Sequence, residues 1–108
     1  MNKPTIEWAP FRTKPGVTEA QLLEASAHLQ TAFVAKQDGF LERRLMRAAD
    51  GGYVDLVLWA SPDSADRAMQ NAAKSETCSL YFSLMQADSA DAGAGVLHFE
   101  TLAEYAAQ

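Results

Sequence analysis

The alternation of apolar and polar residues predicts four β-strands in this chain. In a strand that is half buried against a core, successive side chains point to opposite faces, so every second residue is apolar. The segments with this pattern are residues 5–12, 40–48, 53–60 and 96–102. Pro10 lies in the first of them, and because proline has no N–H to donate, we expect a bulge or an unpaired position there.

Apolar residues recur at helical spacing between these strands. The first helix is predicted over residues 18–37, because Thr18 and Gln21 have the spacing of a capping box. The second begins at Ser61 and Pro62, a residue type that caps helices followed by proline at the first helical position. Both helices therefore have a start signal that is local in the sequence.

The order of the elements predicts the fold class. A further helical stretch over residues 79–85 is either separate or a continuation of the second helix after a kink, and residues 87–95 are predicted to form a loop. The order is then β-α-β-β-α-β, an α+β fold of the ferredoxin-like type over residues 1–108 as one domain. In this fold a four-stranded antiparallel sheet has its helices on one face, and the other face stays open and needs a partner.

Composition narrows the function classes. The chain has 108 residues, 48% of them hydrophobic, and a net charge of −5. Alanine is the most common hydrophobic residue, so the core is short of large side chains, and self-association would relieve that shortage. The acidic balance argues against nucleic acids and anionic membranes as partners, and the lack of a signal peptide or an apolar run of membrane-spanning length predicts a cytoplasmic protein. The lone Cys78 excludes an intrachain disulfide and a CxxC motif.

The glycine-rich turn at residues 49–52 indicates a hairpin between the second and third strands. We expect Ala48 to pair with Tyr53, and Leu45 then lies opposite Leu56. In this register the helix-side face consists of Leu41, Arg43, Leu45, Arg47, Val54, Leu56 and Leu58. The open face consists of Phe40, Glu42, Arg44, Met46, Tyr53, Asp55, Val57 and Trp59. Because this open face mixes aromatic and charged groups, it predicts a partly hydrated cavity.

Polarity assigns Glu7, His98 and Glu100 to the same open face. An imidazole beside a carboxylate, as in His98 and Glu100, could act as a base, or His98 could be a hydrogen-bonded interface residue. Arg44 and Asp55 are diagonal neighbours in the expected register and could anchor an anionic or carbonyl ligand, or form a structural ion pair. No spacing brings two histidines and a carboxylate together, so no metal site is predicted.

Beyond the topology, the chain carries several short sequence features of one known family. They are the Lys14-Pro15-Gly16 turn before the first helix, Gly39-Phe40 at the start of the second strand, and Trp59 at the end of the third, just before Ser61-Pro62. In these features the chain resembles the antibiotic-biosynthesis-monooxygenase-like branch of the dimeric α+β barrel superfamily, over almost its whole length. The resemblance implies an isologous homodimer whose two sheets pack through their open faces, with a pocket between sheet and helices in each subunit.

The resemblance also implies an activity. Members that act as cofactor-independent oxygenases oxidise electron-rich aromatic substrates with O₂, which implies here a monooxygenase-like enzyme without a cofactor for a small aromatic or polyketide-like molecule. His98 would be the base, and Arg44 would steady negative charge. The pocket would be lined by Trp8, Tyr53, Asp55, Trp59 and Glu100. Two alternatives stay open: a small-molecule-binding module without chemistry, and a structural or stress-associated dimer. The absence of asparagine from every predicted strand disfavours the haem-degrading members.

Overall fold

Four strands form one antiparallel sheet. The computed structural model describes residues 3–87 and 95–107. The strands are β1 (Thr5–Phe11), β2 (Phe40–Arg47), β3 (Tyr53–Trp59) and β4 (Leu97–Glu100), arranged in the order β2-β3-β1-β4. Every pair of neighbours is antiparallel, so the predicted ferredoxin-like α+β fold is confirmed.

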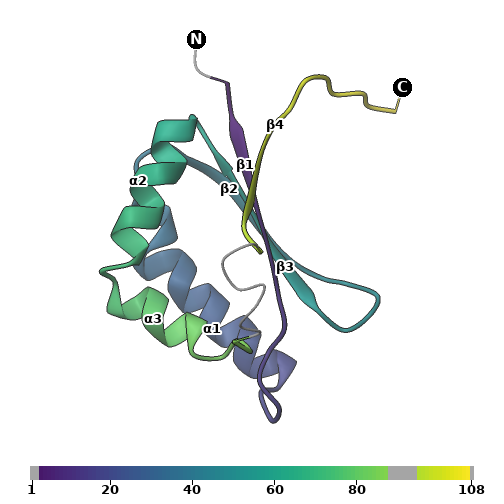
Figure 1. Ribbon diagram of the computed structural model, residues 1–108, viewed down its shortest axis with the longest axis vertical. Helices are drawn as coiled ribbons and strands as arrows, with labels where there is room; N and C mark the ends of the chain where they lie inside the picture. Colours follow the sequence, from purple (N-terminus) through teal and green to yellow (C-terminus); the bar gives the residue numbers. More distant parts are fainter. Residues whose placement is uncertain (1–2, 88–94, 108) are drawn as a thin grey trace.

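The helices all lie against one face of this sheet (Figure 1). They are α1 (Glu19–Ala32), the short 3₁₀ helix η1 (Val34–Lys36), α2 (Pro62–Ala72) and α3 (Glu76–Phe82). The helix predicted over residues 18–37 is therefore divided in two, and the third helical stretch is a separate helix that begins earlier than expected. The predicted loop falls mainly on residues 88–94, which lie outside the described residues. Among the described helices, none has the length and apolar character needed to cross a membrane.

Local capping signals start the two main helices where the sequence predicted. The Thr18 hydroxyl accepts from the Gln21 backbone N–H at 3.1 Å, and the Gln21 side chain accepts from the Thr18 N–H at 2.8 Å. Ser61 likewise accepts from the backbone N–H of Ser64 at 3.1 Å, with Pro62 as the first helical residue. Because each cap satisfies N–H groups that have no partner within the helix, these bonds fix where α1 and α2 begin.

The pairing of β2 with β3 differs from the prediction by one residue. Tyr53 pairs with Arg47, not with Ala48, because Ala48 follows the end of β2 and donates its N–H to the Gly52 carbonyl at 2.7 Å. A shift of one residue moves every side chain of a strand to the other face. The side chains of β3 that face the helices are therefore Tyr53, Asp55, Val57 and Trp59, and those on the open face are Val54, Leu56 and Leu58, the reverse of the expectation.

On β2 the prediction is correct for six residues, among them Glu42, Arg44 and Met46 on the open face, and wrong for two. Arg43, Leu45 and Arg47 face the helices as expected. The register shifts between Phe40 and Glu42, which indicates a β-bulge at Leu41. Phe40 consequently faces the helices and packs edge-on against Trp59, while Leu41 is 52% exposed.

The polar residues of the two neighbouring strands also lie on the helix side. Glu7 on β1 is opposite Val57 on β3 and opposite His98 on β4, and Glu100 is opposite Thr5. Partners in an antiparallel ladder share a face, so the assignment of Glu7, His98 and Glu100 to the open face was wrong. The open face is instead largely apolar, with Glu42 and Arg44 at its β2 edge. Its apolar residues are Ile6, Trp8, Met46, Val54, Leu56, Leu58, Leu97 and Phe99.

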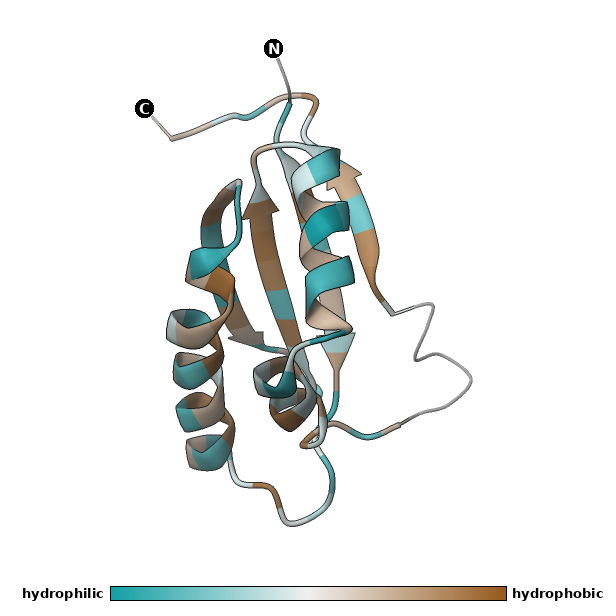
Figure 2. Cartoon of the chain, turned by 90° about the vertical axis from the view of Figure 1, so that its left-hand side faces the viewer, coloured by the Kyte–Doolittle hydropathy of each residue, from teal (hydrophilic) through white to brown (hydrophobic). Residues whose placement is uncertain are grey.

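Two buried clusters hold the helices to the sheet. Figure 2 looks onto the sheet from the helix side, with α1 and α2 in front of different strands. The cluster under α1 and α3 consists of Leu22, Leu29, Val34, Cys78 and Tyr81. The cluster under α2 consists of Val57, Trp59, Ala65 and Ala68. With the core split in this way, the small alanines of α2 leave room between the sheet and the helices.

Candidate functional site

A cavity of about 850 Å³ lies between the inner face of the sheet and the helices. This volume is in the range of small-molecule binding sites. Its wall is mainly apolar and aromatic, and the rings of Phe11 and Tyr53 stack at 5.6 Å between centroids. Other apolar lining residues are Leu29, Phe33, Val34, Phe82 and Met85. Such a wall fits a flat, apolar ligand better than a strongly polar one.

Glu7 and Trp59 form a polar contact in the wall of this cavity. The indole Nε1 of Trp59 donates to Oε1 of Glu7 at 3.2 Å. Burial raises the pKa of Glu7 above its ordinary value of 4.5, an effect that the hydrogen bond from Trp59 and the charge of His98 oppose without cancelling. A carboxylate with a raised pKa accepts a proton more readily than a free one, so Glu7 has the chemistry of a general base.

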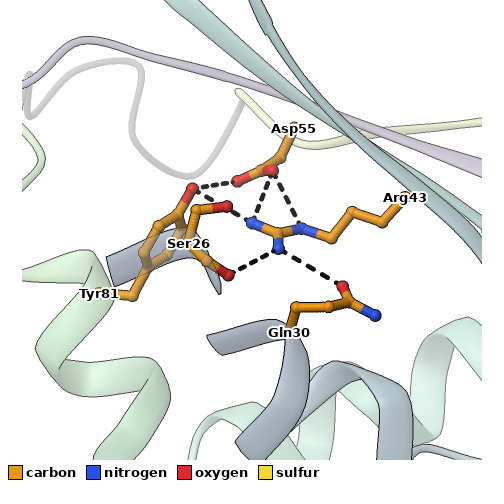
Figure 3. A network of polar contacts seen from close by, with 5 residues as sticks. All are labelled: Ser26, Gln30, Arg43, Asp55 and Tyr81. Carbon is orange, nitrogen blue, oxygen red and sulfur yellow. Dashed lines mark hydrogen bonds and ion pairs between the residues drawn. The ribbon is translucent and has the colours of Figure 1, made fainter. Parts of the chain in front are cut away.

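A second polar group in the cavity wall is the ion pair of Arg43 and Asp55. Figure 3 shows the contacts of this pair with Ser26, Gln30 and Tyr81. The two side chains are only 6% and 10% exposed, and Nη2 of Arg43 lies 2.9 Å from Oδ1 of Asp55. Nη1 of Arg43 donates to the Ser26 carbonyl at 3.1 Å and to the Gln30 side chain at 3.5 Å. The Tyr81 hydroxyl donates to the other oxygen of Asp55 at 2.7 Å. The positive charge of Arg43 is thus compensated inside the protein.

Tyr81 stays neutral within this network. Burial raises its pKa far above the ordinary value, and the adjacent Asp55 carboxylate raises it further. The hydroxyl therefore remains a donor to Asp55, which then has a partner on each oxygen. Asp55 is fully engaged, whereas the only side-chain hydrogen bond to Glu7 from the described residues is the one at Oε1. Of the two carboxyl groups that β1 and β3 carry on the inner face, Glu7 is the one with an oxygen available to a ligand.

The structure brings together only some of the residues that the sequence indicated. Tyr53, Asp55 and Trp59 line the cavity. Trp8 and Arg44 lie on the open face, on the other side of the sheet, and Arg44 pairs with Glu42 at 3.3 Å. The expected neighbourhood of Arg44 and Asp55 is therefore wrong, because the two residues lie on opposite faces.

His98 and Glu100 lie on β4, at an edge of the sheet, and both are exposed. Glu100 pairs with Lys3 at 3.1 Å, and neither β4 residue is among those that line the cavity. Within residues 3–87 and 95–107, no three His, Cys, Asp or Glu side chains are grouped so that they could hold a metal ion.

Three residues of the site were not singled out from the sequence: Glu7, Arg43 and Tyr81. A signal existed for Arg43, because an arginine that alternates with leucines on a strand must either reach solvent or find a counter-charge, and Asp55 is the acidic residue of the neighbouring strand. The signal for Glu7 was its place between Ile6 and Trp8, because neighbouring residues of a strand point to opposite faces and Glu7 must therefore lie on the face opposite to these two. Nothing local in the sequence indicated that Tyr81 would meet Asp55.

Comparison with solved structures finds the same fold along almost the whole chain. A variant of SnoaB, a cofactor-independent oxygenase from Streptomyces nogalater, is 20% identical, with 96% of both chains covered and a TM-score of 0.67. A protein from Bordetella bronchiseptica, provisionally described as an antibiotic biosynthesis monooxygenase, is 18% identical, covers 94% of this chain and 100% of its own, and has a TM-score of 0.66.

A third protein with the same provisional description, from Nitrosomonas europaea, is 12% identical, with 94% and 93% covered and a TM-score of 0.65. No family model and no curated protein matches the sequence. The chain therefore has the ferredoxin-like α+β fold of the antibiotic biosynthesis monooxygenases.

Proposed function

We propose that this protein is a cofactor-independent, monooxygenase-like enzyme that oxidises a small aromatic or polyketide-like molecule with O₂. The observation that carries the proposal is a carboxyl group with a raised pKa, Glu7, held by Trp59 in the wall of a largely aromatic cavity. The likeness in fold to SnoaB, which is a cofactor-independent oxygenase, supports it.

In the proposed reaction the substrate carries an activated CH₂ group beside a ring or carbonyl. Glu7 takes one proton from that carbon, and the resulting carbanion is electron-rich enough to react with O₂. One oxygen atom of O₂ stays on the carbon as a carbonyl, and the other leaves as water with the two hydrogens of the CH₂ group. The indole of Trp59, which bonds Glu7 in the cavity wall, would offer the ring an aromatic surface beside the base.

The charges around the cavity favour a substrate that enters neutral. The guanidinium of Arg43 is already paired with Asp55, so it offers no free charge to an anion. Glu7 itself repels anions once it is ionised, and the whole chain carries a net charge of −5. A weakly acidic, uncharged aromatic molecule needs no free positive charge to bind and is not repelled on entry, since it becomes negative only during the reaction.

We also propose that two copies of the chain pair through their open sheet faces. This face carries apolar residues from all four strands, among them Trp8, Leu56 and Phe99. A contiguous apolar face of this kind marks an interface in proteins that stay in solution. A cytoplasmic location stays a prediction from the sequence.

Anthrone tests the proposed reaction, because it is a flat, uncharged molecule with one activated CH₂ group, and its oxidation by O₂ gives anthraquinone and water. We expect the protein to accelerate O₂ uptake and Glu7→Gln to lower the rate by about 100-fold or more, since the amide cannot accept the proton. Glu24→Gln is the matched control, because Glu24 is exposed on α1 and is not among the residues that line the cavity.

Binding is measured separately from turnover through the fluorescence of Trp59, which lies in the cavity wall. Quenching by anthrone that disappears in Trp59→Phe shows that the ligand enters the cavity. Binding without O₂ uptake would contradict the proposed enzymatic activity and favour a small-molecule-binding module. Full activity of Glu7→Gln would refute the role of Glu7.

A further inference from the structure

The cavity carboxyl of Glu7 has an ionisable neighbour on the edge strand. β4 pairs with β1, and in this register His98 lies directly opposite Glu7 on the same face. Side chains opposite each other in an antiparallel pair have Cβ atoms about 5 Å apart. Glu7 is half-buried and lines the cavity, whereas His98 is exposed at the edge of the sheet. The pair therefore spans the distance from the cavity wall to solvent.

The other charged groups around Glu7 are already bound to each other. Asp55 on β3 and Arg43 on β2 form the buried ion pair. The buried residues of α2 on this side are Ala65 and Ala68, which carry no charge. His98 itself has Glu100 two residues along its strand, but that carboxylate is paired with Lys3. Among the described residues, the group free to exchange a proton with Glu7 is thus His98.

The hydrogen bond from Trp59 decides which carboxyl oxygen of Glu7 exchanges the proton. It occupies Oε1, so Oε2 is the oxygen that carries the proton. We propose that His98 is the proton-exchange partner of Glu7 and carries protons between this cavity carboxyl and solvent. The proposal rests on the proposed function of Glu7 as the base and gives His98 a positioning role, because it acts on substrate only through Glu7.

The exchange moves one proton and no electrons. The O–H bond at Oε2 breaks, a ring nitrogen of His98 gains the proton directly or through one water, and the imidazolium then loses a proton to bulk water. While His98 is an imidazolium, its positive charge also favours the ionised form of Glu7.

The enzyme needs this route when Glu7 is protonated before the substrate reacts. The oxidation returns both substrate hydrogens to water and so needs no net proton. A resting molecule with a protonated Glu7 is nevertheless inactive, and burial makes that form more common than for a free carboxyl. Its proton must leave to solvent before the substrate can react, and the exposed His98 gives it a path.

The experiment compares His98→Gln with His28→Gln, in which the chain's other histidine, exposed on α1, is replaced. We expect the acid limb of the pH–rate profile for anthrone oxidation to move to higher pH in His98→Gln only. Turnover on that limb should fall roughly threefold, the effect of losing one partly screened positive charge. Added imidazole should restore the rate of His98→Gln and leave the wild-type rate unchanged, a response that a purely structural histidine would not give.

A second measurement needs no substrate. In protein with ¹³C-labelled glutamate carboxyls, the Glu7 signal is identified by its loss in Glu7→Gln. Its titration midpoint should move to higher pH in His98→Gln and stay in place in His28→Gln. An unchanged midpoint together with an unchanged profile and no rescue by imidazole would overturn the role of His98 and leave the proposed function standing. Full turnover in Glu7→Gln would overturn both.

Discussion

The buried ion pair of Arg43 and Asp55 makes a quantitative prediction about stability. Asp55→Asn removes the negative charge with little change in shape and leaves the guanidinium of Arg43 in a site where it is 6% exposed. Removing one partner of a buried pair costs about 3–5 kcal/mol, because the other charge stays buried without compensation. The free energy of unfolding of a domain is only about 5–15 kcal/mol, so this variant should be close to unfolding at room temperature.

Two further variants separate the charge from the hydrogen bonds. Tyr81→Phe removes the 2.7 Å hydrogen bond to Asp55 but keeps the ion pair, so it should cost less, about 1.5–3 kcal/mol. The double variant Arg43→Met/Asp55→Asn leaves no buried charge, and we expect it to be more stable than Asp55→Asn alone. Asp66→Asn, on an exposed position of α2, serves as the control.

Urea unfolding followed by tryptophan fluorescence measures these differences. All variants are compared at one protein concentration, because self-association would add to the apparent stability. With a slope of about 1–3 kcal/mol per molar urea, Asp55→Asn should lower the midpoint by about 1 M or more. A loss below about 1 kcal/mol, or a double variant less stable than Asp55→Asn, would refute the reasoning that an uncompensated buried charge sets the cost.

Two other predictions concern Glu7 and the open face. Burial raises the pKa of Glu7 in the folded protein above its ordinary value of 4.5. At a pH between the ordinary and the raised pKa, unfolding therefore releases the proton of Glu7. The contribution of Glu7 to stability falls as the pH rises through that window. Glu7→Gln should remove this fall in urea titrations at a series of pH values, and an identical pH dependence in both proteins would contradict it. On the open face, Leu56→Lys should convert a dimer into a monomer in analytical ultracentrifugation, whereas Leu23→Lys on α1 should not. A wild-type monomer, or a dimer that survives Leu56→Lys, would argue against pairing through this face.

The sequence by itself determined the elements and their order. The capping residues Thr18 and Ser61 act on N–H groups within three residues of themselves, so their effect could be predicted without knowing the rest of the fold. The alternation of apolar and polar residues likewise located every strand to within a few residues. From this order the ferredoxin-like topology followed.

The tertiary structure decided which face each strand presents. The outcome depends on which residue lies opposite Ala48, and its hydrogen bond to Gly52 makes this residue Gly52 and not Tyr53. Side chains alternate with a period of two, so this single residue transfers Asp55 and Trp59 from the expected open face to the cavity. The bulge at Leu41 has the same kind of effect on Phe40.

Only the folded chain shows the candidate site. Glu7 meets Trp59 across 52 positions of sequence, and Tyr81 meets Asp55 across 26. Polarity alone assigned Glu7 to the wrong face, because charged residues are normally excluded from the side of a sheet that helices cover. Here that side encloses a cavity and a compensated ion pair, and both depend on contacts between elements that no local pattern contains.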